Sequence, residues 1–329
     1  MLVKPSEYTP AFSAALKRRL GEAFPESQVA VALGGAEVAA FVSRLPVDHL
    51  LFTGSTEVGR RVMLAAAENL TPVTLELGGK SPVIVCDDYG LERAAKDIAF
   101  GKWVNAGQTC IAPDYVLVPA AQAEALATAI VAQVAVQYPT VADNPQYSSI
   151  ITERHHARLT SAVEEARAAG ARVLSHGEPE SAGARKINPT VVLDPPLDGR
   201  LMREEIFGPV LPIVGYKTLD EAIAFVNARE RPLALYCLSG SRSKRERVLA
   251  ETVSGNATVN GTLLHIAQED LPFGGVGPSG IGAYHGREGF KRFSHARGVF
   301  EVRGVNPFDW LAPPYGRFAD TLVKAIRRL

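Results

Sequence analysis

Cys110 is the residue of this chain that is best placed to act as a nucleophile. It lies in the segment N-A-G-Q-T-C-I-A-P, a polar connection with a glycine, where catalytic groups are often found. Cys86 and Cys237 end or interrupt apolar runs, so we expect them to be small core side chains. Only a thiolate is nucleophilic, and the surroundings decide which thiol becomes one. Residue type alone leaves the alternative that Cys110 simply falls in a connection.

Glu76 is the candidate general base. It lies one residue before the end of the apolar segment 73–77 and is followed by Gly78, Gly79 and Lys80. Burying a carboxylate is costly unless it is paired, and burial raises its pKa toward the working range of a general base. The two glycines allow close approach of another group to the backbone. A structural ion pair with Lys80 is the alternative, and the sequence leaves both open.

Three further segments carry residues that could bind a ligand. The segment 52–59, F-T-G-S-T-E-V-G, follows an apolar run and opens a helix, so its free N–H groups could meet a phosphate. Lys4 and Glu7 place a cation and a carboxylate where they could hold the hydroxyls of a ribose. Glu205 and Phe207 combine an acid with an aromatic ring before a strand. Taken singly, each pattern is weak: a plain strand-to-helix turn is at least as compatible with residues 52–59, and a solvated acid before a strand is the alternative for Glu205.

Length and composition limit the class of protein. At ~150 residues per domain, 329 residues correspond to about two domains. Lysine plus arginine and aspartate plus glutamate both total 35, so the net charge is zero and nothing favours nucleic acid or an anionic membrane. No apolar run approaches the ~18 residues of a membrane span. The start lacks a secretory signal, and three cysteines give no disulfide framework. We expect a cytoplasmic protein.

The order of the expected elements predicts the fold class. Short apolar strands alternate with helices of about 10 to 15 residues, which predicts parallel sheets covered by helices, the doubly wound α/β class. Binding sites in this class gather at the carboxyl ends of the strands. The expected strands are 29–33, 50–52, 73–77, 82–86, 115–118, 190–193, 210–216, 233–238 and 258–259, and the expected helices are 11–23, 37–44, 58–69, 91–106 and 120–136.

Six motifs in order give the chain a resemblance to a known family. They are K-P-S-E, F-T-G-S-T-x-x-G, L-E-L-G-G-K, G-Q-T-C, E-E-I-F-G-P-V and P-F-G-G-V-G-x-S-G, spread from residue 4 to residue 280. Together they resemble the aldehyde dehydrogenase superfamily. The last motif, the following H-G-R-E-G-F and the P-P-Y-G-R near the end look most like the class 3 branch, which includes coniferyl aldehyde dehydrogenases.

The resemblance implies a reaction and two catalytic residues. Cys110 would attack the aldehyde carbon, the thiohemiacetal would give hydride to a nicotinamide, and a thioester would remain on the enzyme. Glu76 would then activate the water that hydrolyses the thioester. The implied substrate is a small-molecule aldehyde, aromatic such as coniferyl aldehyde or of medium chain length. Two alternatives remain: a non-catalytic remnant of the family, or a thiol esterase that uses Cys110 without hydride transfer.

The resemblance also implies which residues bind the cofactor. Gly54 and Ser55, in the motif that ends at Gly59, would meet the pyrophosphate. Lys4 and Glu7 would bind the adenosine ribose, and Glu205 would bind the nicotinamide ribose. Phe207 would flank the nicotinamide ring. A carboxylate at Glu7 accepts hydrogen bonds from free ribose hydroxyls and repels a 2′-phosphate, so we favour NAD, although this branch tolerates NADP.

The resemblance begins in the middle of the family's cofactor domain. We expect an N-terminally truncated chain with an incomplete doubly wound, Rossmann-like cofactor domain at 1–77, an α/β catalytic domain with a parallel sheet at 78–283, and a C-terminal return and oligomerisation or tail segment at 284–329. The family's W-N-F-P-type segment, whose asparagine helps to form the oxyanion hole, is missing. Asn105, on the expected helix 91–106, is not expected to replace it. An exposed sheet edge is expected near the N-terminus.

The remaining expectations concern partners. The family suggests a homodimer. No spacing of histidine, cysteine and acidic residues matches a metal site, so no metal is expected. Phe318, Leu322, Ile326 and Leu329 fall on one helical stripe. Packing on the protein is favoured for this stripe, so membrane contact is not expected.

Overall fold

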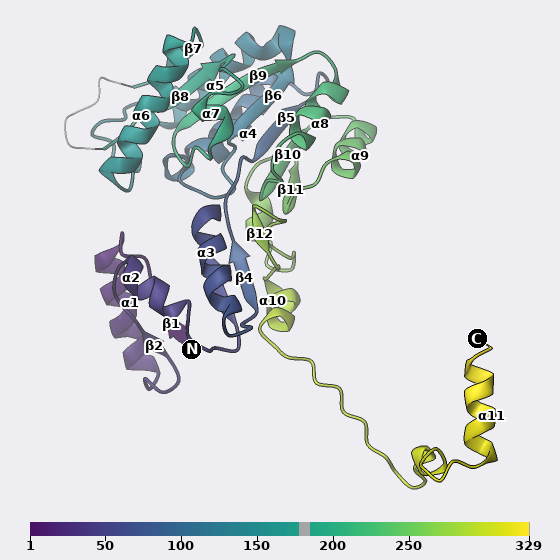
Figure 1. Ribbon diagram of the computed structural model, residues 1–329. Helices are drawn as coiled ribbons and strands as arrows, with labels where there is room; N and C mark the ends of the chain where they lie inside the picture. The colour runs from purple at the N-terminus through teal and green to yellow at the C-terminus, as the bar shows by residue number, and fades with distance from the viewer. Residues whose placement is uncertain (178–184, 329) are drawn as a thin grey trace. The chain divides into compact units, whose positions relative to one another are not determined.

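The computed structural model describes residues 1–177 and 185–328, and its contacts divide the chain into two units, Met1–Phe293 and Ser294–Leu329 (Figure 1). The first unit contains the three β-sheets of the described residues, with two, three and seven strands. Helices separate most of the strands along the chain. The α/β class predicted from the sequence is therefore confirmed.

The seven-stranded sheet forms the framework of the larger part. Its strand order is β11-β10-β5-β6-β9-β8-β7, and every neighbouring pair is parallel except β7 with β8. The strands are β5 (Pro82–Val85), β6 (Tyr115–Pro119), β7 (Arg172–Ser175), β8 (Thr190–Leu193), β9 (Val210–Tyr216), β10 (Ala234–Leu238) and β11 (Asn256–Val259). A parallel sheet must be covered on both faces, and β5, β8 and β10 are buried along their whole length.

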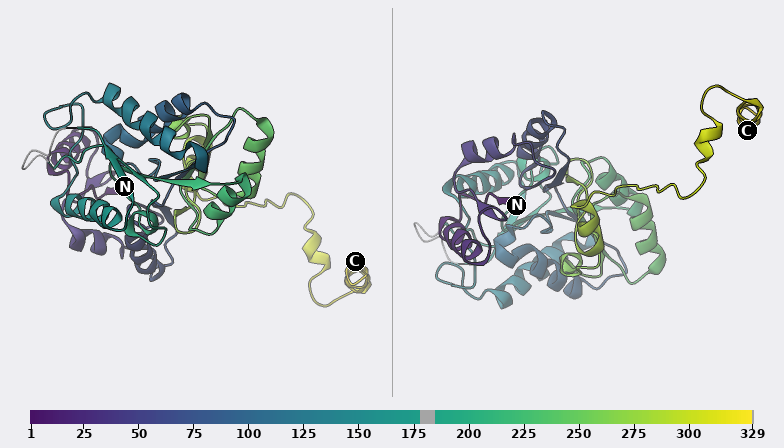
Figure 2. Two further views of the ribbon diagram at one scale, coloured as in Figure 1. Left: turned by 90° about the horizontal axis from the view of Figure 1, so that it is seen from above. Right: turned by 90° about the horizontal axis from the view of Figure 1, so that it is seen from below.

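Helices cover both faces of this sheet, as a doubly wound fold requires (Figures 1 and 2). Successive residues of β5 point to opposite faces. Val83 and Val85 belong to a core with residues of α4, α5 and α6, whereas Ile84 belongs to a core with residues of α8 and α9. The helices are α4 (Leu91–Trp103), α5 (Ala123–Gln137), α6 (Glu153–Ala168), α7 (Arg200–Arg203), α8 (Leu219–Asn227) and α9 (Arg242–Glu251), with short 3₁₀ turns η1 (Val104–Gly107), η2 (Ala120–Gln122) and η3 (Leu264–Ala267).

A three-stranded sheet carries the candidate base. Its order is β12-β4-β3, where β3 (Leu50–Thr53) and β4 (Val73–Glu76) are parallel and β12 (Gly280–Ile281) is antiparallel to β4. Helix α3 (Thr56–Ala67) contributes Val62 and Ala66 to a small core with Leu75 and Leu77. A Cβ on Gly280 would lie 2.3 Å from the Leu75 carbonyl oxygen, so β12 approaches β4 this closely only with glycine there.

The first residues form a β-α-β unit. Strand β1 (Leu2–Val3) pairs in parallel with β2 (Ala30–Val31), and α1 (Pro10–Ala23) connects them, followed by α2 (Ala36–Val42). The sheet has two strands, so each has an edge that pairs with no strand. Leu2 is correspondingly 39% exposed, and the prediction of an exposed sheet edge near the N-terminus is confirmed.

Helix α10 (Gly286–Arg292) ends the first unit, and the second unit contains η4 (Pro307–Trp310) and α11 (Arg317–Ile326). Phe318, Leu322 and Ile326 of the predicted stripe lie on α11, whereas Leu329 lies outside the described residues. Among the helices that the structure describes, none combines the length and the apolar character needed to cross a bilayer.

The strands were easier to predict than the connections. Strands 190–193 and 210–216 are confirmed to the residue. The expected helix 91–106 was wrong at its end, because α4 stops at Trp103 and Asn105 and Ala106 have φ angles of 51° and 50°. Strands β7 and β12 were not predicted. In the case of β12, two residues are too few to carry a periodic pattern.

The turn after α4 depends on one glycine. Gly107 has φ +73°, and a Cβ there would lie 2.2 Å from the Gly208 carbonyl oxygen. We expect Gly107→Ala to lower the free energy of unfolding by on the order of 2–4 kcal/mol, because strain and a backbone clash add. Denaturant unfolding monitored by circular dichroism measures this loss of unfolding free energy.

Gly90 supplies the control for this prediction. It caps the other end of α4 with φ −63°, and a Cβ there would meet nothing within 4 Å. We expect Gly90→Ala to cost less than ~1 kcal/mol. Equal losses in the two variants would contradict the close approach of Gly107 to Gly208.

Candidate active site

Cys110 lies between η1 and β6, half-buried against the larger core. Burial raises the pKa of its thiol to about 11, and the charges of Glu205 and Glu76 add to the rise. The backbone N–H groups of Cys110 and Ile111 act in the opposite direction, because they donate hydrogen bonds that favour the thiolate. Cys86 and Cys237 are buried in the core, as predicted.

Glu76 is the last residue of β4 and is only 3% exposed. Neither oxygen of its carboxyl group has a hydrogen-bond partner among the described residues. Burial therefore raises the pKa of this carboxyl group to about 8. Its backbone is fixed on both sides: the carbonyl accepts from the N–H of Gly54 at 3.0 Å, and Gly280 of β12 is its register partner.

The charge of this carboxyl group acts on the thiol. The Glu76 charge raises the pKa of the Cys110 thiol. Burial, together with the charges of Glu76 and Cys110, raises the pKa of Tyr284 to about 12. Electrostatic effects of this kind require the three side chains to lie close together. The two residues singled out from the sequence, 34 positions apart, are therefore brought to one centre, with Tyr284 beside them.

Lys80 does not pair with Glu76, so the ion pair that the sequence left open is wrong. Its ammonium group forms a buried ion pair with Asp114 instead, with the two side chains 11% and 4% exposed. The same ammonium donates to the carbonyls of Leu201 at 2.7 Å and Glu204 at 3.0 Å. The second oxygen of Asp114 accepts from the N–H of Ile206 at 2.9 Å. These contacts join three segments that are far apart in the sequence.

Glu205 lies in the third of these segments, between the Glu204 carbonyl and the Ile206 N–H that Lys80 and Asp114 hold, and its side chain is half-buried. Burial raises the pKa of its carboxyl group to about 7, with Asp114 adding to the rise and the Gly79 N–H and Lys80 opposing it. A Cβ on Gly78 would lie 2.1 Å from a carboxylate oxygen of Glu205, so the glycine pair makes room for that carboxylate. The alternative prediction, that Glu205 is a solvated acid, is wrong because its carboxyl group is partly buried.

Lys102 was missed by the sequence analysis. It lies in the last turn of α4, is fully buried, and its Nζ has no hydrogen-bond partner among the described residues. Burial lowers its pKa to about 8, although Asp114 and Glu205 act to raise it. No sequence signal distinguishes this lysine from a surface lysine of an amphipathic helix, and the same holds for Arg158 of α6.

Four other predicted cofactor residues, Lys4, Glu7, Gly54 and Ser55, follow strands of the two smaller sheets. Lys4 and Glu7 follow β1 and form an ion pair of 2.9 Å. A backbone hydrogen bond and Lys4 lower the pKa of Glu7. The Ser55 hydroxyl accepts from the N–H of Val58 at 3.4 Å and caps α3. The Gly54 N–H already donates to Glu76, so Gly54 allows close approach rather than offering a donor.

Asn105 is used within its own turn. Its side-chain amide donates to the carbonyl of Gln108 at 3.1 Å, and Gln108 donates back to the Asn105 carbonyl at 3.2 Å. This is the role expected of an asparagine at a helix end, although the residue is left-handed and not helical.

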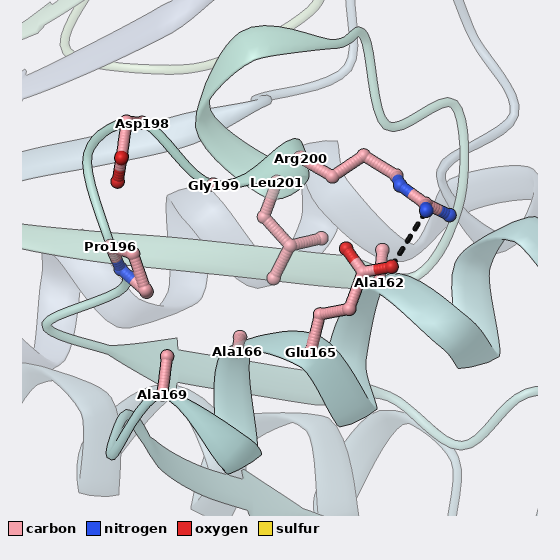
Figure 3. A pocket seen from close by; sticks show the side chains of 9 residues that line it. All are labelled: Ala162, Glu165, Ala166, Ala169, Pro196, Asp198, Gly199, Arg200 and Leu201. Carbon is pink, nitrogen blue, oxygen red and sulfur yellow. Dashed lines mark hydrogen bonds and ion pairs between the residues drawn. The ribbon is translucent and has the colours of Figure 1, made fainter.

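A surface pocket lies elsewhere, between α6 and the segment before α7 (Figure 3). Its volume is about 190 Å³, and an ion pair of 2.6 Å between Arg200 and Glu165 closes one side. None of its nine lining residues is a predicted site residue. Over the described ranges, no group of three or more His, Cys, Asp or Glu side chains could hold a metal ion.

The fold and this centre define a class of protein. It is a doubly wound α/β protein in which the charges of a buried unpaired carboxyl group, Glu76, and a half-buried one, Glu205, both act on the half-buried thiol of Cys110.

Comparisons with known proteins narrow this class to a family. The model of the aldehyde dehydrogenase family matches residues 1–299. A probable coniferyl aldehyde dehydrogenase of Caulobacter vibrioides is 51% identical over 96% of the chain. The chain belongs to the aldehyde dehydrogenase family, and it spans 66% of the length of that relative.

Solved structures agree with this assignment. Staphylococcus aureus AldH in a substrate-bound state superposes with a TM-score of 0.87 at 40% identity, over 99% of this chain and 70% of that one. The NAD-dependent aldehyde dehydrogenase of Sinorhizobium meliloti gives a TM-score of 0.84 at 33% identity, over 93% of this chain and 62% of that one.

The raised pKa of Glu76 makes the stability of the fold depend on pH. The folded chain keeps this proton up to about pH 8, whereas the unfolded carboxyl group loses it near 4.5, so unfolding releases a proton between these values. Rising pH therefore destabilises the native chain relative to Glu76→Gln. We expect their difference in unfolding free energy to widen by up to ~3 kcal/mol between about pH 5 and pH 7.5.

Denaturant titrations of both proteins at several pH values measure this difference. Glu57→Gln is the matched control, because the Glu57 side chain is 75% exposed and its difference from the parent chain should stay constant. A pH-independent difference for Glu76→Gln would show that the carboxyl group is not perturbed.

Proposed function

We propose that Cys110 and Glu76 catalyse the oxidation of an aldehyde to a carboxylic acid, with NAD or NADP as the hydride acceptor. The observation that carries this proposal is the buried Glu76 carboxyl group, which has no hydrogen-bond partner and acts on the Cys110 thiol. An unpaired buried carboxyl group is costly to maintain, and such costs are found where a group takes part in chemistry.

The proposed reaction has two stages. In the first, sulfur of Cys110 bonds to the aldehyde carbon and the proton moves to the aldehyde oxygen, which gives a thiohemiacetal. Loss of hydride from carbon and of the hydroxyl proton leaves a thioester on Cys110. In the second stage Glu76 takes a proton from water, the hydroxide attacks the thioester, and the acid leaves with the thiol restored. A carboxyl group with a pKa of about 8 is well matched to that proton transfer.

The residues present fit a dinucleotide. The first N–H groups of α3 have no partner within the helix and lie beside Gly54, where a phosphate is stabilised by the helix N-terminus. The Lys4–Glu7 pair provides a donor and an acceptor for ribose hydroxyls, and the Glu205 charge acts on the Cys110 thiol. When bound, the nicotinamide supplies the hydride acceptor. The lowered pKa of Glu7 keeps it ionised, which favours NAD over NADP.

We propose an aromatic aldehyde as the substrate. The named activity of the Caulobacter vibrioides relative supports this choice. Aromatic rings next to the reaction centre support it too: Tyr284 packs edge-on against Phe273 and His285, with ring centroids 5.8 and 4.9 Å apart. The homodimer and the cytoplasmic location expected from the sequence stay predictions.

Substitution of Glu76 separates the two stages. We expect Glu76→Gln to form about one NADH per Cys110 with coniferyl aldehyde and then to turn over ~10²–10⁴-fold more slowly, because the base for thioester hydrolysis is lost. Cys110→Ala should form no NADH in either phase. Stopped-flow absorbance of NADH measures both.

The matched control is Cys237→Ala, since this thiol lies in the core, away from the centre. It should retain the parent's ratio of burst to steady-state rate. Turnover of a nitrophenyl ester without any nucleotide, together with no NADH from aldehyde, would favour a thiol esterase instead. Absence of both activities in the parent chain would favour a non-catalytic remnant.

A further inference from the structure

The segment that carries Glu205 and Phe207 has a strained conformation. Phe207 has φ +46°, in the left-handed region that a residue with a large side chain rarely adopts. Strain of this kind persists only where neighbouring contacts determine the backbone. Lys80 and Asp114 hold one side of the segment through the Glu204 carbonyl and the Ile206 N–H.

Arg158 of α6 holds the other side. One guanidinium nitrogen donates to the Glu205 carbonyl at 3.1 Å, and the other donates to the Ile206 carbonyl at 2.6 Å. The side chain is 28% exposed, and its pair with the Glu204 carboxylate, at 3.7 Å, is long. The two backbone hydrogen bonds are therefore its stronger contacts.

The chemistry of arginine suits this task. A guanidinium is planar and presents N–H groups in a fixed fork, so two bonds to consecutive carbonyls fix the orientation of both peptide groups. A lysine ammonium is a point charge on a flexible chain and cannot impose the same orientation. The positive charge also acts on the Glu205 carboxyl group and favours its ionised form.

We propose that Arg158 is a positioning residue for the nicotinamide half of the cofactor, because it fixes the two peptide groups that flank Ile206 and so aims the side chains of Glu205 and Phe207 on either side of it. This inference rests on the proposed function. It can be tested separately, because Arg158 should affect binding of the nicotinamide end of the dinucleotide. Binding of the adenosine end, near Lys4, Glu7 and α3, should stay unchanged.

Paired nucleotides test the proposal. ADP has the adenosine ribose and both phosphates but lacks the nicotinamide riboside, so the ratio of NAD to ADP affinity isolates that half. We expect Arg158→Met to raise the dissociation constant for NAD about tenfold, as loss of two charged hydrogen bonds implies, and that for ADP by less than about twofold. Arg158→Lys should recover part of the loss, and calorimetric titration of NAD and of ADP into the parent chain and both variants measures the dissociation constants.

Hydrogen–deuterium exchange of the nucleotide-free chain gives a second readout. We expect peptides covering residues 201–207 to exchange faster in Arg158→Met, while those of the buried α5 stay unchanged. Arg167→Met is the matched control, because Arg167 lies on the same helix in an exposed pair with Glu164. It should change neither the affinity ratio nor the exchange.

The outcomes separate this inference from the proposed function. If the parent chain binds neither nucleotide, the proposed function fails and the role of Arg158 toward the cofactor fails with it. If the parent binds both and Arg158→Met weakens them equally, or leaves the exchange of 201–207 unchanged, the positioning role is overturned while the proposed function stands. A general loss of packing would instead speed exchange in α5 as well.

Discussion

The buried ion pair between Lys80 and Asp114 is the interaction on which the site depends. Lys80 follows Glu76 by four residues, Asp114 follows Cys110 by four, and the remaining bonding capacity of both is directed to the segment that carries Glu205. Removing two charges from water costs free energy that is offset only when every donor and acceptor is used. Here the extra bonds go to backbone groups of one segment, so the pair stabilises a particular arrangement of three chain segments.

Desolvation explains the electrostatics of this centre. The same burial raises the pKa of the Cys110 thiol and of the Glu76 and Glu205 carboxyl groups, so each is held toward its neutral form. Three ionised groups of one sign could not coexist there without a compensating cation. The buried ammonium of Lys102, whose pKa is lowered to about 8, interacts with the charges of Asp114 and Glu205 and so supplies a positive charge near Glu205.

The sequence allowed the fold class and the two central residues to be predicted, because strands carry apolar runs and the motifs surround groups that do chemistry. It did not allow the partner of Lys80 to be predicted, since Glu76 is close in number whereas Asp114 is close only after folding. Arg158 resembles the other charged residues of an amphipathic helix, and its role becomes visible only when α6 is packed against residues 205 and 206. The need for glycine at position 107 likewise follows from a distant carbonyl, that of Gly208, which comes close to Gly107 only after folding.

The pairing of β12 with β4 has a consequence for how the chain is made. Gly280 lies beside Glu76 in the sheet, although some two hundred residues and the whole seven-stranded sheet separate them along the polypeptide. During synthesis the segment with Glu76 leaves the ribosome well before Gly280, its antiparallel neighbour in the sheet, has been made. Contacts of such long sequence separation form late and slowly. The pairing that completes the three-stranded sheet beside Glu76 therefore forms only after the strands of the seven-stranded sheet have been synthesised.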